Sequence, residues 1–180
     1  MLARLHNDHK HIAILLKILQ NKQQRLESAE PVNFNLIRDI VEYMQSYAEH
    51  SHHPLEDLID DYFKQRHPEG DPVTQLADEH HRLIDTSTQL MSLINLILSD
   101  VPVANAQLSE LLRDYVALQK NHMIFEETTL FPKWQAMLSL EDWQKINDQC
   151  QERFITDPLF NDDDNLLFEE LREYLQKAED

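Results

Sequence analysis

The chain of 180 residues is 42% apolar and has 33 acidic against 16 basic side chains, a formal net charge of −17. This length and apolar content fit one globular domain and exclude a disordered chain. So acidic a chain disfavours nucleic acid and anionic membranes as partners. The sequence has no apolar run of about 18 residues, and we therefore expect no membrane span. A single cysteine, Cys150, and an N-terminus without the apolar core of a signal peptide favour a cytoplasmic location.

Two long helices are predicted in the first part of the chain. The first covers residues 2–28, where apolar residues recur every three or four positions and His9 takes one of these core positions. The second covers residues 34–65, and its apolar stripe runs on through His52 and Glu56. Polar side chains thus replace apolar ones on the core face of both helices.

Two further long helices follow the segment 66–72, which holds the only glycine and two prolines. The third helix is expected over residues 73–98, with His80 at a core position, and the fourth over residues 105–137, with His122 and Glu126 on its stripe. Prolines inside the second helix and near the end of the fourth predict a local bend or loosening there. These are Pro54 and Pro132.

The rest of the chain predicts a helical extension. Residues 140–154 have the pattern of a short helix, and residues 165–177 that of a final amphipathic helix after an acidic loop. We therefore divide the chain into a four-helix bundle over residues 1–138 and an extension over residues 139–180 that packs on it.

The first two helices resemble the next two. The repeated polar residues are His9, His52 and Glu56 in one half and His80, His122 and Glu126 in the other, at offsets of 71 and 70 positions. In each half the second helix offers a histidine and a glutamate four positions apart, which places them one turn apart on one face. At about 1.5 Å of rise per residue, all six side chains reach the same height of an antiparallel bundle.

Six polar side chains buried in one apolar layer need partners, because unpaired burial is costly. Histidine and glutamate facing inward from a duplicated helical hairpin are the pattern of a two-metal carboxylate bundle, in which the glutamates can bridge the ions. Ligands of this kind, without a thiolate, suit iron, manganese or zinc. Six ligands on two ions leave positions open for dioxygen, peroxide, nitric oxide or water. A metal-free hydrogen-bonded network is the structural alternative.

Five further residues next to the six predicted ligands are candidates for an alternative ligand or for side chains that orient the ligands. His53 lies three positions before Glu56 and competes with His52 for the role of ligand. Four acidic residues stand next to predicted ligands and either orient the imidazoles or are surface charges. They are Asp8, Asp57, Glu79 and Glu127.

Four motifs resemble those of the hemerythrin-like proteins, the HHE cation-binding domains. They are NDH at residues 7–9, HHPLED at 52–57, DEH at 78–80 and HMIFEETTLFP at 122–132. The resemblance implies an all-α, up-down antiparallel four-helix bundle around a non-haem pair of iron ions. By it, the four histidines named above would be terminal ligands and the two glutamates would bridge.

One position departs from the oxygen-carrying hemerythrins, which place two histidines four positions apart on the third helix. Here the residues four before and four after His80 are Leu76 and Ile84. The chain is more similar to the members with four histidines and two glutamates that sense or handle iron, oxygen or nitric oxide.

We therefore expect a protein that binds or senses iron, dioxygen or nitric oxide at a two-iron site, with peroxide as a further small ligand. The alternative is a di-iron oxidoreductase or peroxidase, or a protein that repairs iron–sulfur clusters. Repair proteins of this type often carry paired cysteines in an added N-terminal segment, and Cys150 is the only cysteine here. Whether the protein is an enzyme stays open, and a homodimer is compatible with the sequence.

Overall fold

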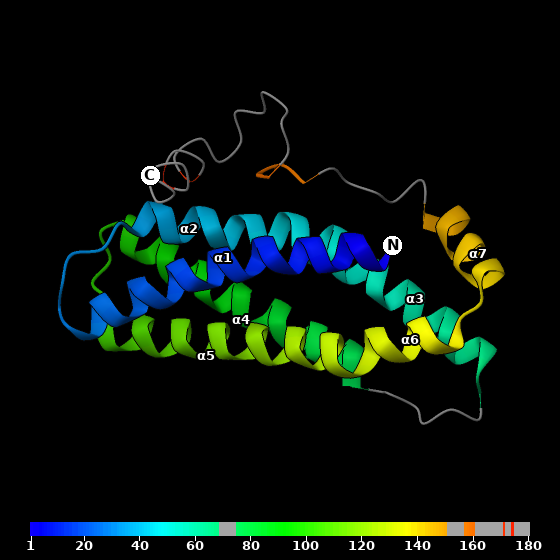
Figure 1. Ribbon diagram of the computed structural model, residues 1–180. Helices are drawn as coiled ribbons and strands as arrows, with labels where there is room; N and C mark the ends of the chain where they lie inside the picture. Colours follow the sequence, from blue (N-terminus) through cyan, green and yellow to red (C-terminus); the bar gives the residue numbers. More distant parts are fainter. Residues whose placement is uncertain (69–74, 151–156, 161–170, 172–173, 175–180) are drawn as a thin grey trace.

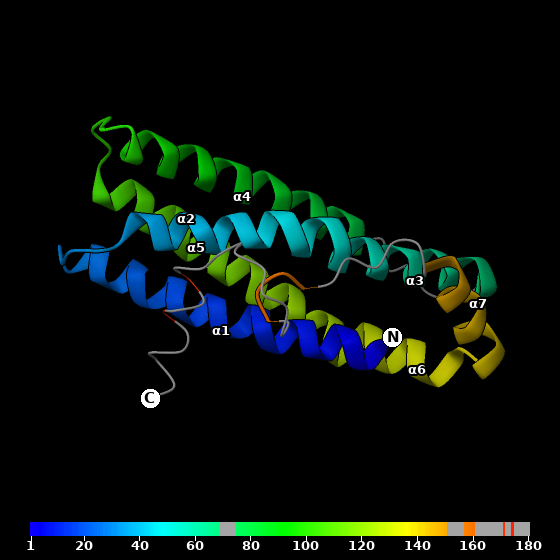
Figure 2. The same ribbon diagram turned by 90° about the horizontal axis from the view of Figure 1, so that it is seen from above.

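The computed structural model describes residues 1–68, 75–150 and 157–160, together with Leu171 and Tyr174. Within them the predicted all-helical, antiparallel bundle is confirmed (Figures 1 and 2). Its four rods are α1 (Leu2–Glu27); α2 (Phe34–Tyr43), η1 (Met44–His52) and α3 (His53–Arg66); α4 (Gln75–Leu98); and α5 (Asn105–Phe125), η2 (Glu126–Leu130) and α6 (Phe131–Met137). Both α1 and α4 pack against α2 and α5, so the rods enclose a common core.

Two of the rods contain a stretch of π-helix, in which an N–H bonds to the carbonyl five positions earlier. At the end of η1, the N–H of His53 donates to the carbonyl of Ala48. Both stretches end two positions before a proline, Pro54 after η1 and Pro132 after η2. Proline lacks an N–H and crowds the carbonyl four positions back in a regular helix. The loosening expected at these prolines is therefore found as a widened turn rather than as a break.

A layer of polar side chains divides the apolar core into two clusters. On α1, Leu5 belongs to one cluster and Ile12 to the other, and His9 lies between them in the sequence. On the fourth rod, Val116 and Leu130 bracket the His–Glu pair in the same way. The apolar clusters hold the rods together on both sides of the polar layer, and so fix where its side chains meet.

The extension begins with α7 (Leu140–Cys150), which packs on α3. It matches the predicted short helix as far as Cys150, and residues 151–154 of that prediction lie outside the described residues. The helix expected over 165–177 lies outside the described residues, apart from Leu171 and Tyr174, which are helical. The division of the chain at residue 138 stays a prediction. None of the described helices is both long and apolar enough to cross a lipid bilayer.

Candidate metal centre

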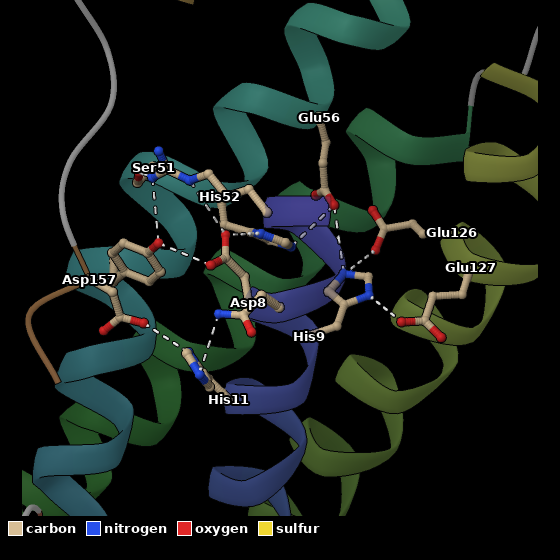
Figure 3. Close-up of polar contacts among 12 residues, drawn as sticks. Asp8, His9, His11, Ser51, His52, Glu56, Glu126, Glu127 and Asp157 are labelled. Atoms are coloured by element: carbon tan, nitrogen blue, oxygen red, sulfur yellow. Dashed lines mark hydrogen bonds and ion pairs between the residues drawn. The ribbon is translucent and has the colours of Figure 1, made fainter. Parts of the chain in front are cut away.

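The four rods bring the six predicted residues together in one buried layer. The residues His9, His52, Glu56, His80, His122 and Glu126 are only 0 to 3% exposed. The Nε2 atom of His9 lies 3.3 Å from a carboxylate oxygen of Glu126 and 3.7 Å from one of Glu56. Figure 3 shows these three side chains pointing toward one another. Histidines from both halves of the repeat therefore surround a shared pair of carboxylates.

Two overlapping groups of side chains have the geometry to hold one ion each. The first is His9, His52, Glu56 and Glu126, and the second is His53, Glu56, His80 and His122, with the ligand atoms of each group within 4.8 Å of one another. Glu56 belongs to both groups. Glu126 also reaches the second, because the Nε2 atom of His122 lies 3.2 Å from its carboxylate. Both glutamates are thus placed between the two groups.

The structure buries both His52 and His53, which the sequence had set as alternatives. The ring of His53 stacks on that of His80 with centroids 4.2 Å apart, and lies edge-on to His122 at 5.4 Å. Consecutive residues of an α-helix point about 100° apart. The wider winding of η1 reduces this angle, so two neighbouring imidazoles can face the same layer. In the group of His53, Glu56, His80 and His122, the third imidazole is thus that of His53, which lies on α3 and not on α4 with His80.

Seven of the inward-facing atoms of the layer make no hydrogen bond of good geometry. They are the Nε2 atoms of His9, His80 and His122 and both carboxylate oxygens of Glu56 and Glu126. Each buried polar atom left unpaired costs about 1–3 kcal/mol. The closest nitrogen and oxygen atoms among them lie 3.2 to 3.3 Å apart as ion pairs, at angles unsuited to hydrogen bonds. Converging nitrogen and oxygen lone pairs instead fit metal ions, and their mixture suits iron, manganese or zinc.

The outward-facing nitrogens of four histidines are held by carboxylates. Each pair joins a histidine Nδ1 to a carboxylate oxygen: His9 to Glu127 at 3.0 Å, His52 to Asp8 at 3.1 Å, His80 to Asp57 at 2.9 Å and His122 to Glu79 at 3.0 Å. When Nδ1 donates outward, the lone pair of Nε2 points inward, as metal binding requires. All four acidic residues that the sequence singled out therefore orient imidazoles.

The charge of the metal-free layer is shared unevenly among its histidines. Burial disfavours an imidazolium, but the carboxylates nearby outweigh it and raise the pKa of His9, His52 and His80 to about 9. Burial prevails at the other two rings. It lowers the pKa of His122 and, helped by the neighbouring charge of His80, lowers the pKa of His53 well below its ordinary value.

The two glutamates differ in the same way. Burial raises the pKa of Glu126 well above its ordinary value, and the charge of Glu56 adds to this effect. Burial also opposes ionisation of Glu56, but the imidazole of His52 and the other rings around it outweigh burial and lower its pKa. In the metal-free protein the surroundings therefore favour the ionised form of Glu56 and disfavour that of Glu126.

A third group with ligand-type atoms, formed by Asp8, His11 and Asp157, adjoins this layer (Figure 3). Its oxygens are already used as acceptors. Asp8 accepts hydrogen bonds from Tyr47 and a layer histidine, and Asp157 accepts from His11, Tyr43 and two backbone N–H groups. Because these lone pairs already accept hydrogen bonds, we interpret the group as a hydrogen-bonded contact between the bundle and residue 157 and not as a metal site.

Comparison with known proteins gives one family. Residues 1–134 match the family described as the hemerythrin HHE cation binding domain. This range includes every residue of the two groups, and so the family and the buried clusters both indicate cation binding. No curated protein and no solved structure shows a significant match to the chain.

Proposed function

Since the chain belongs to the hemerythrin HHE cation-binding family, we propose that it holds a pair of iron ions and binds or senses dioxygen or nitric oxide there. The unpartnered, converging atoms of Glu56 and Glu126 and of three histidines carry this proposal. His9, His52, His53, His80 and His122 would be terminal ligands, and the two glutamates would bridge the ions. The ions would supply reversible binding of a small ligand, and the protein supplies the enclosure around it.

The two ions would have unequal surroundings. Three histidines belong to the group around His80 and only two to the group around His9. The ion beside His9 and His52 therefore has fewer protein ligands, and an added ligand would bind on that side. Since the ligand residues are at most 3% exposed, the enclosure favours small molecules.

Metal analysis tests the proposal directly. Untagged protein should contain two iron ions per chain, and exposure of the reduced protein to dioxygen or nitric oxide should change its absorption spectrum. Glu56→Ala should lose the iron and the spectral change together. A wild-type protein that takes up no divalent metal would refute the proposal. Turnover of peroxide by the loaded protein would favour an enzyme over a binding protein.

Metal binding should release protons, and it should strengthen as the pH rises toward 9. At pH 7 three imidazoles, those of His9, His52 and His80, have a pKa of about 9 and hold protons that ligands must lose. We expect about three protons released per chain, measured by calorimetry in buffers of different ionisation enthalpy. The stability of the metal-free fold should instead fall as the pH rises. A histidine with a raised pKa stabilises the fold below 6.5, and that contribution is lost as the pH rises through about 9.

A further inference from the structure

Residues 157–160 of the extension are tied to the bundle by an extensive set of contacts. The carboxylate of Asp157 accepts hydrogen bonds from Tyr43 at 3.0 Å and from His11 at 3.1 Å. The same carboxylate accepts the backbone N–H groups of Leu159 and Phe160. The ring of Phe160 stacks on His11, with centroids 3.9 Å apart and planes within 12° of parallel. The side chains of Asp157 and Phe160 thus hold the segment to one place on α1 and α2, and its own backbone N–H groups fix the turn around Asp157.

From this place a line of buried contacts leads to the metal layer. Tyr43 stacks on Tyr47 with ring centroids 5.6 Å apart. The hydroxyl of Tyr47 donates to Asp8 at 3.1 Å, and the other oxygen of Asp8 holds Nδ1 of His52 at 3.1 Å. Burial raises the pKa of both tyrosines, so their hydroxyl groups stay protonated and donate. Asp157 is therefore connected to His52 through three intervening side chains.

Among the described residues, the other half of the repeat has no such line. Glu79 corresponds to Asp8 and holds His122, but it is 13% exposed against 5% for Asp8. Glu79 also accepts a hydrogen bond from Gln75, an exposed residue of the same helix. The positions that correspond to the two tyrosines, 70 residues on, are Arg113 and Ala117. Within the part of the chain that the structure describes, a hydrogen-bonded line to residues 157–160 starts from the group with two histidines.

We propose that residues 157–160 are a latch that holds His52 in place through Tyr43, Tyr47 and Asp8, and so controls exchange at the ion beside His9 and His52. The proposal rests on the proposed function, because it assigns a control to one half of that site. With the latch closed, Asp157 fixes Tyr43, the stacked ring keeps Tyr47 at Asp8, and Asp8 keeps the His52 ring directed inward. When the latch opens, the His52 ring is free to turn away, and the ion with fewer protein ligands is the one that leaves.

Removal of iron by a chelator tests the latch. Protein loaded with Fe²⁺ is mixed anaerobically with an excess of a ferrous chelator, and two phases are expected, one for each ion. Asp157→Asn should accelerate one phase roughly 10-fold and leave the other unchanged. A factor of about 10 is the lower end of the effect of losing a residue that hydrogen-bonds a metal ligand. Tyr43→Phe should do the same, and the double variant should be no faster than either single one. Asp114→Asn, the same change at an exposed position of α5, is the control.

The metal-free protein supplies a second readout. Asp157→Asn and Tyr43→Phe should shift the imidazole nitrogen resonances of His52 and leave those of His122 in place. Equal acceleration of both phases, or of neither, would overturn the latch. If the His52 resonances shift but the wild type takes up no iron, the proposed function fails while the connection to the extension stands. If iron binds and His52 does not respond, the latch alone fails.

Discussion

Glu126→Ala should abolish binding of the metal pair and remove the stability that the metal confers. The carboxylate of Glu126 lies 3.3 Å from the Nε2 atom of His9 and 3.2 Å from that of His122, so its loss takes a ligand from both ions. Metal bound at 1,000 times its Kd stabilises a fold by about 4 kcal/mol. For a chain of this length that is roughly 10 °C in Tm. Iron analysis and thermal unfolding with and without metal measure the two effects.

The same variant should change little in the metal-free protein. Burial and the charge of Glu56 raise the pKa of Glu126 and disfavour its ionised form there, so its loss should cost the metal-free fold less than the loss of Glu56 would. Glu127→Ala is the matched control, since its carboxylate is 46% exposed and contacts only the outer nitrogen of His9 among the predicted ligands. That variant should keep both ions and bind them 10–100-fold more weakly, by order of magnitude. A fully metallated Glu126→Ala protein would remove this glutamate from the set of ligands.

His53→Met should reduce the metal content from two ions to one while leaving the metal-free protein as stable or more stable. Methionine is the residue at the corresponding position of the other half, Met123. The pKa of His53 is lowered by burial, and its Nδ1 has no hydrogen-bond partner. Replacing a buried, unpaired polar group removes a penalty of about 1–3 kcal/mol, or roughly 2–10 °C in Tm.

The opposite signs of these two effects make the His53 variant informative. A residue that only packs in the core would change stability and leave the metal content alone. His50→Met provides the control, because His50 is the exposed histidine of η1. A His53→Met protein that still binds two ions would leave the group around His80 with two histidines. The proposed inequality between the ions would then be wrong.

The sequence by itself was sufficient for the bundle and for six of the seven His and Glu residues in its polar layer. Helical periodicity makes this possible, since a polar residue on an apolar stripe must face the core. The repeat then set the heights, because equal helix lengths on both sides of each loop bring His9 level with Glu56 and His80 level with Glu126. The acidic neighbours were also visible, as each adjoins a predicted ligand.

Three features depended on the tertiary structure. Periodicity treats His52 and His53 as alternatives, and only the π-helical turn before Pro54 allows both to face the layer. Tyr47 has the pattern of an ordinary core residue, and its bond to Asp8 exists because two rods pack at one register. Asp157 lies more than 100 positions from both of its side-chain partners, Tyr43 and His11. Local sequence carries no information about contacts of such separation, because they form only when the whole chain folds.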